Sequence, residues 1–134
     1  MPTLDEFRTF FLEKVDAFSR RDWPAMLGDL PEGFEWHFPS EVVDRPEPVR
    51  PNELKDSVAD LVSQFPDLKV DVLEIVEPAP DAFVVRLLAR GSGASSGAAI
   101  QLELAQLWEF EGDQPVRVRE FMNLADALAN ADGS

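Results

Sequence analysis

The spacing of apolar residues changes partway along this chain, and the change constrains its fold more than any other feature. Up to about residue 66, apolar side chains mostly recur every three or four positions, which is the period of an amphipathic α-helix. After residue 68 they recur at every second position, the period of a β-strand with one buried face. Helices followed by consecutive strands predict an α+β fold, in which helices pack on one face of a mainly antiparallel sheet.

Three helices are expected in the first half of the chain. Thr3 opens a capping-box pattern in front of a helix over residues 4–19. Asp22 can cap a second, short helix. A third helix is expected from about residue 52, and Pro66 ends it.

Five strands are expected beside these helices. A short strand over residues 34–38 precedes a proline-rich loop at 39–51. In the next strand the apolar phase switches between Val72 and Leu73, which indicates a β-bulge or a bend. A curved sheet of this kind predicts a cone-shaped barrel with an apolar pocket at its mouth. The four later strands are expected over residues 68–77, 82–90, 98–111 and 116–123.

Composition excludes several classes of function. The chain has 12 Lys and Arg against 26 Asp and Glu, and its net charge of -14 repels nucleic acids and anionic membranes. The absence of cysteine and the single histidine exclude thiolate and multi-histidine metal sites, which leaves only carboxylate-bound ions open. We therefore expect no nucleic-acid partner and no membrane partner. We also expect no metal and no cofactor, because the proton-transfer reaction considered below needs neither.

The length of 134 residues suits one domain. We expect a single domain over residues 1–126 and a short C-terminal tail over 127–134. The N-terminus lacks the positive leader and apolar segment of a signal peptide, and no stretch is long enough to span a membrane. The expected location is the cytoplasm.

Several short motifs occur in order along the chain. They are Asp22 with Trp23, Glu35 with Trp36, FPDL at 65–68, Ser96 with Gly97, and the closing segments LWEFEGDQPVRVREF and LADALANADG. Together they resemble the SnoaL-like polyketide cyclases of the nuclear transport factor 2-like superfamily, which also contains ketosteroid isomerase and limonene epoxide hydrolase. The resemblance implies a cystatin-like cone, a small-molecule ligand and a homodimer.

The catalytic sets of these relatives match the sequence only in part. Ketosteroid isomerase uses a tyrosine and a protonated aspartic acid. This chain has no tyrosine, and the resemblance places Gln106 at the position of that aspartic acid. The Asp-Arg-Asp set of limonene epoxide hydrolase is not reproduced around Arg86 and Arg90. The late-strand carboxylate of SnoaL has only Glu120 as a candidate, and strand alternation is expected to turn Glu120 outward and Arg119 inward.

Three polar residues remain as candidates for chemistry. Gln106 could orient a ligand, or it could be a buried amide bonded to backbone or water. Arg119 could bind a carboxylate or an enolate, or it could pair with a surface acid. His37 is of the residue type that most often transfers protons near neutral pH, but its neighbours in the strand are expected to turn it toward solvent or a partner subunit.

Further residues are candidates for the pocket wall, although aromatic residues at these positions also suit an ordinary core. Asn123 could close the pocket or cap a last helix. Val84 and Leu88, on the second face of their strand, are expected to bury against a second copy of the chain. The complete set of wall candidates is Trp23, Trp36, Phe38, Phe65, Trp108, Phe121 and Asn123.

The sequence thus predicts a SnoaL-like protein that binds a small apolar or aromatic carbonyl compound. As an enzyme, it would transfer protons in an isomerisation or cyclisation. The alternative is a non-catalytic ligand-binding or dimerisation module, because no inward carboxylate can be identified from the sequence.

Overall fold

The computed structural model describes residues 2–39 and 48–131. Its helices are α1 (Leu4–Ser19), α2 (Trp23–Leu27), α3 (Pro51–Gln64) and α4 (Leu124–Asn130). Its strands are β1 (Glu35–His37), β2 (Lys69–Ala79), β3 (Ala82–Ser92), β4 (Ala99–Glu111) and β5 (Gln114–Phe121). Most of the proline-rich loop expected over residues 39–51 lies outside the described residues.

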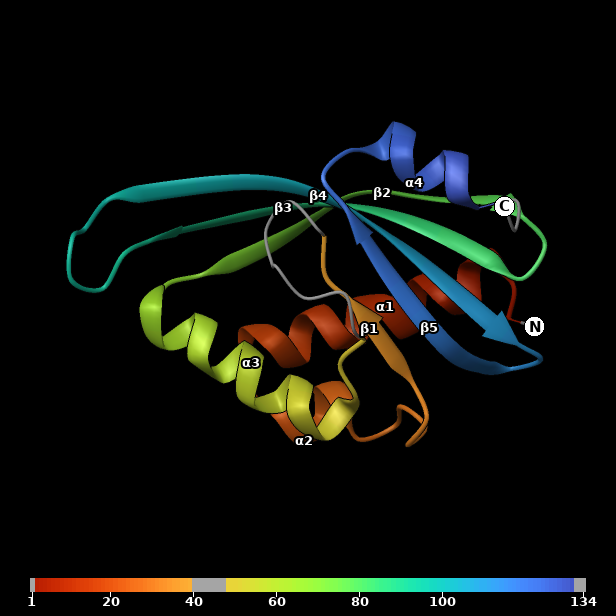
Figure 1. Cartoon of the computed structure of the whole chain (residues 1–134), viewed down its shortest axis with the longest axis horizontal. Helices are drawn as coiled ribbons and strands as arrows, with labels where there is room; N and C mark the ends of the chain where they lie inside the picture. The colour runs from red at the N-terminus through yellow and green to blue at the C-terminus, as the bar shows by residue number, and fades with distance from the viewer. Residues whose placement is uncertain (1, 40–47, 132–134) are drawn as a thin grey trace.

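The strands form one five-stranded sheet in the order β1-β5-β4-β3-β2. Only the β1–β5 pair of this sheet is parallel, and the other pairs are antiparallel. Helices α1, α2 and α3 lie against one face of the twisted sheet, and α4 lies against the other (Figure 1). The expected α+β architecture is confirmed. We call the face toward α1–α3 the inner face and the face toward α4 the outer face.

Local signals in the sequence set the first two helix starts. The Thr3 hydroxyl accepts a hydrogen bond from the backbone N–H of Glu6, and the Glu6 side chain accepts one from the backbone N–H of Thr3. The Asp22 carboxylate accepts a hydrogen bond from the backbone N–H of Ala25 at the start of α2. Both caps agree with the sequence prediction, because they depend only on residues within one turn of the helix.

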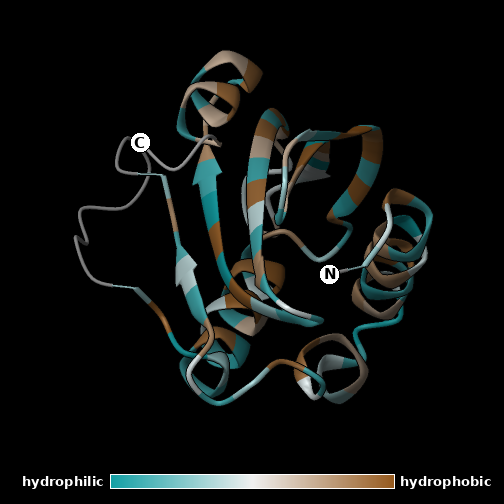
Figure 2. Ribbon diagram, turned by 90° about the vertical axis from the view of Figure 1, so that its right-hand side faces the viewer, coloured by the Kyte–Doolittle hydropathy of each residue, from teal (hydrophilic) through white to brown (hydrophobic). Residues whose placement is uncertain are grey.

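The apolar core fills much of the space between the inner sheet face and α1. Phe7 of α1 stacks on Phe83 of β3 with ring centroids 4.3 Å apart, and Trp108 of β4 meets Phe7 edge-on. Hydrophobic and hydrophilic residues alternate along the strands (Figure 2), as expected where one side of a strand is buried. None of the four helices in the described residues combines the length and hydrophobicity that a membrane span needs.

A second, smaller apolar cluster lies on the outer face beneath α4. Ala127 of α4 is fully buried there and belongs to the same cluster as Val84 of β3 and Leu107 of β4. The expectation that Val84 is buried by a second copy of the chain is therefore wrong, because α4 of the same chain covers it. Since α4 spans residues 124–130, the boundary expected between 126 and 127 falls inside this helix.

Three register shifts, typical of β-bulges, interrupt the strand ladders in the described residues, and two of them bear on the sequence prediction and the site. One lies in β2 between Val72 and Glu74, where the apolar phase of the sequence switches, and this bulge was predicted. The other lies in the β4–β5 ladder, where Phe110 pairs with Pro115 but Glu109 pairs with Arg117. One extra residue in β5 therefore reverses the facing of every later side chain in that strand.

The second bulge corrects the orientation expected for the end of β5. Beyond it, Gln106 pairs with Glu120, so that both side chains lie on the inner face. Arg119 pairs with Leu107 and faces outward. The expectation that Arg119 points inward and Glu120 outward is wrong, because it assumed a regular hairpin.

Candidate active site

A cavity of about 530 Å³ lies between α1–α3 and the inner face of the sheet. Most of its wall is apolar, with Phe11, Leu54 and Leu104 among the residues that line it. A cavity of this size and character suits a small, largely apolar ligand. The polar residues in its wall are Lys14, Ser57, Asp60, Gln64, Gln106 and Glu120.

A chain of hydrogen bonds links three side chains in the cavity wall. The Trp108 indole Nε1 donates to Oε1 of Gln106 over 2.9 Å, and Nε2 of Gln106 donates to Oε2 of Glu120 over 2.8 Å. An indole N–H can only donate, so the amide oxygen of Gln106 must face Trp108 and the amide nitrogen must face Glu120. Oε2 of Glu120 is thereby fixed as an acceptor, and the other carboxyl oxygen, Oε1, is left to carry the proton of the neutral acid.

The surroundings of Glu120 favour its protonated form. Burial raises the pKa of Glu120 above its ordinary value of 4.5, and the hydrogen bond from Gln106 and the nearby Trp36 indole offset this only in part. Among the described residues, no Lys, Arg or His forms an ion pair with Glu120. A carboxyl group whose pKa is moved toward neutral pH is suited to both donating and accepting protons.

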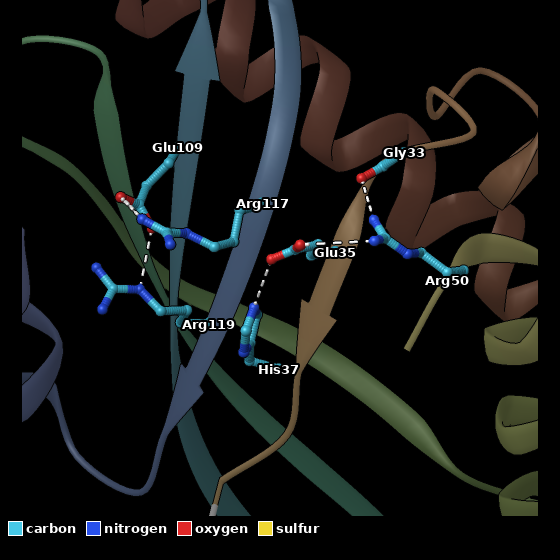
Figure 3. A network of polar contacts seen from close by, with 7 residues as sticks. All are labelled: Gly33, Glu35, His37, Arg50, Glu109, Arg117 and Arg119. Carbon is cyan, nitrogen blue, oxygen red and sulfur yellow. Dashed lines mark hydrogen bonds and ion pairs between the residues drawn. The ribbon is translucent and has the colours of Figure 1, made fainter. Parts of the chain in front are cut away.

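Four of the residues predicted for the site line the cavity: Gln106, Trp36, Phe38 and Trp108. The two other polar candidates, His37 and Arg119, lie on the outer face (Figure 3). Nε2 of His37 is 3.1 Å from a carboxylate oxygen of Glu35. Arg119 is hydrogen-bonded to Glu109 over 3.0 Å and to the carbonyl of Asn130 over 3.3 Å.

The remaining wall candidates also lie elsewhere. Trp23 packs against the ring of Phe18, with the ring centroids 5.9 Å apart. Phe65 is the C-terminal cap residue of α3, and Phe121 packs against the cluster under α4. The Asn123 side chain accepts a hydrogen bond from the backbone N–H of Asp126, which makes it the N-cap of α4. None of these four lines the cavity.

Glu109 forms ion pairs with Arg117 and Arg119 on the outer face. Both of its carboxylate oxygens accept hydrogen bonds from Arg117, at 2.8 and 2.7 Å, and one also accepts from Arg119 (Figure 3). Burial alone would raise the pKa of Glu109, but the two arginines outweigh it and hold the pKa below its ordinary value. Glu109 is therefore a paired anion, unlike Glu120 on the other side of the sheet.

Sequence reasoning placed only Gln106 among the polar residues of the cavity wall, and it missed Lys14, Ser57, Asp60, Gln64 and Glu120. Alternation within its own strand predicts that Glu120 faces outward. Pro115 is the sequence signal that could have corrected this prediction, because a proline within a strand is typical of bulges and edges. Lys14 lies in the apolar stripe of α1 between Phe11 and Phe18. Lys14 is only 8% exposed, and its ammonium group donates a hydrogen bond to the Met26 carbonyl over 2.7 Å.

The described residues contain no group of three or more His, Asp or Glu side chains placed as metal ligands.

The fold and the cavity together define an α+β protein whose helices and sheet enclose a mostly apolar cavity with the carboxyl group of Glu120 in its wall. Residues 11–118 match the SnoaL-like domain, and the chain belongs to that family. None of the curated proteins matches the chain in sequence.

Several solved structures share the fold, which is that of the nuclear transport factor 2-like and cystatin-like proteins. AclR from Streptomyces galilaeus, a proposed hydroxylase, is 16% identical with a TM-score of 0.74, covering 98% of this chain and 99% of its own. IdmH from Streptomyces antibioticus, a proposed polyketide cyclase, is 16% identical with a TM-score of 0.71, over 92% and 96%. TerC, co-crystallised with polyporic acid, is 15% identical with a TM-score of 0.69, over 92% and 95%. At these identities the similarity establishes the fold alone.

Proposed function

We propose that this protein binds a small apolar or aromatic carbonyl compound in the cavity and transfers protons on it, with Glu120 as the acid and base. The observation that carries the proposal is a partly buried carboxyl group, held by Gln106, in the wall of a mostly apolar cavity. Such an environment raises the pKa of Glu120, which suits the carboxyl group to both donating and accepting a proton.

In the proposed reaction, the carboxyl group of Glu120 acts first as a base and then as an acid. Ionised Glu120 takes a proton from a carbon next to the carbonyl group, and the bound compound becomes an enolate. The neutral acid then returns the proton to another carbon, which isomerises the compound. In a cyclisation, the enolate carbon instead attacks a second carbonyl group, and the acid protonates the alkoxide that forms. Neither sequence needs an oxidant or a reductant.

The relatives support a small ligand but do not select the reaction. TerC was crystallised with polyporic acid, IdmH is a proposed cyclase and AclR a proposed hydroxylase. One fold therefore carries different proposed reactions, and the polar groups of the pocket must decide between them. In this chain the inward polar pair is Gln106 and Glu120.

The test begins with ligand binding. Purified protein is screened by thermal shift against hydroxy-aromatic polyketides, steroids, terpene epoxides and small acids. Each stabilising carbonyl compound is then incubated in D₂O, and exchange at its carbon next to the carbonyl group is followed by ¹H NMR. Glu120→Gln is expected to slow enzyme-dependent exchange by about 100-fold or more.

Two variants of the outer face serve as controls. Arg119→Gln changes the neighbouring residue of the same strand, and His37→Gln changes the histidine on β1. Both are expected to keep the wild-type exchange rate, because neither residue lines the cavity. A wild-type rate in Glu120→Gln, or its loss in either control, would contradict the proposed role of Glu120.

A non-catalytic binding module is the second candidate, and the co-crystal of TerC with a small molecule favours it over a purely structural role. Stabilisation by a ligand without exchange would support this candidate. If no class of compound stabilises the protein, the dimerisation module is favoured. The homodimer stays a prediction, and sedimentation of the purified protein measures its oligomeric state directly.

A further inference from the structure

Trp36 of β1 carries an indole N–H that has no hydrogen-bond partner. Its Nε1 is the one buried side-chain nitrogen or oxygen without a partner in the part of the chain that the structure describes. The whole residue is only 8% exposed, so bulk water does not satisfy it. Unpartnered buried donors are rare in folded proteins because they cost free energy, and each one calls for an explanation.

Trp36 and Glu120 are neighbours on the inner face of the sheet. In the parallel β1–β5 pair Trp36 aligns with Val118, and Glu120 follows two residues later on the same face of β5. Both side chains line the cavity. The nearby indole N–H favours the charged form of Glu120 and so lowers its pKa, against the effect of burial.

We infer that Trp36 is a positioning residue whose indole N–H donates to the Glu120 carboxylate when that group is ionised. The inference rests on the proposed function in taking Glu120 as the group that transfers protons. In the neutral acid Oε2 is already engaged by Gln106 and Oε1 carries the proton. Loss of that proton leaves a charged oxygen that attracts a nearby N–H more strongly than the neutral group does.

No other group around Glu120 in the described residues, apart from Gln106, is placed to stabilise its negative charge. Lys14 from α1 lines the same cavity but is paired with Asp29, and Asp60 from α3 is itself an acid that cannot compensate a negative charge. The compensation for a buried negative charge must therefore come from neutral donors on the adjacent strands, Gln106 of β4 and Trp36 of β1. The charged side chains of β1, β4 and β5 near this point belong to the opposite face, and they are Glu35, His37, Glu109, Arg117 and Arg119.

An NMR titration of the ligand-free protein tests the inference. The chain has three tryptophans, so three indole N–H signals are followed together with the Glu120 carboxyl carbon from pH 4 to 9. The Trp36 indole proton is expected to move downfield with the same midpoint as Glu120. The Trp23 signal is the internal control and is expected to stay flat, because Trp23 packs on Phe18 outside the cavity. In Glu120→Gln the titration of Trp36 is expected to disappear.

The variant Trp36→Phe gives a second readout. Loss of one charge-assisted hydrogen bond is expected to raise the pKa of Glu120 by about one pH unit. The inference is overturned if the titration midpoint of Glu120 is unchanged in a folded Trp36→Phe variant. It is also overturned if the indole proton of Trp36 in the wild type does not shift as Glu120 titrates. If Trp36→Phe does not fold, the wild-type titration decides alone. Because no ligand is used, a flat Trp36 signal together with lost exchange in Glu120→Gln would reject this inference and keep the proposed function.

Discussion

Gln106 and Glu120 face each other across the β4–β5 ladder, and a 2.8 Å hydrogen bond joins them on the cavity side of the sheet. Trp108 fixes the direction of this bond, because its indole N–H must meet the amide oxygen of Gln106. The pair gives the cavity a carboxyl group with a defined free oxygen. The stability and the chemistry expected of this protein both depend on that arrangement.

Replacing Glu120 with Gln is expected to stabilise the protein at neutral and alkaline pH. The folded protein holds the Glu120 proton more tightly than the unfolded chain does, because burial raises the pKa. The stability that this proton contributes is complete below the ordinary value of 4.5 and is lost as the pH rises through the raised pKa. Thermal unfolding from pH 4 to 8 should show Glu120→Gln and wild type converging in acid. A variant less stable than wild type at pH 8 would contradict this.

Replacing Glu109 with Gln is expected to have the opposite effect. The arginines hold the pKa of Glu109 below its ordinary value of 4.5, so its contribution is present above that pH and is lost on acidification. Because the pair is partly solvated, the cost at pH 7 is expected to be about 1 kcal/mol. Urea unfolding at pH 7 and pH 4 measures it. Equal costs at both pH values would exclude the ion pairs as the cause.

Replacing Gln106 with Leu is expected to destabilise the protein by about 1–3 kcal/mol, because it leaves the Trp108 N–H and a Glu120 oxygen without their partner. The matched control is Gln101→Leu, at an exposed position of the same strand. That control is expected to stay within about 0.5 kcal/mol of wild type. Equilibrium unfolding in urea compares the two, and equal losses would show that the hydrogen-bond chain is not what matters.

Replacing Lys14 with Met is expected to loosen α1 from α2. The buried Lys14 ammonium donates to the Met26 carbonyl and to the Asp29 carboxylate, both at or beyond the end of the short second helix. Loss of these bonds is expected to cost about 1–3 kcal/mol. Lys55→Met, at an exposed position of α3, is the control and should have little effect. Hydrogen exchange of the α2 amides locates the change. Unaltered protection of these amides would contradict the role of Lys14 in holding α2 against α1.

Much of the fold could be predicted because its signals are local. The cap of Thr3 on α1 involves residues three positions apart, and the phase switch at Val72 marks its own bulge. The alternating residues of β4 identify its buried face without reference to any partner strand. These features need only the geometry of a helix turn or of a strand.

The candidate site could be predicted only in part, because it depends on how two strands are paired. Gln106 and Trp36 were recognised from the alternation within their own strands. Glu120 was not, since its facing is set by one extra residue in the β4–β5 hairpin, and a shift of one residue moves every later side chain to the other face. The sequence by itself thus determined the elements, the family and the apolar cavity. Only the tertiary structure decided that Glu120, and not Arg119, lies inside it, because strand register is a property of the pair.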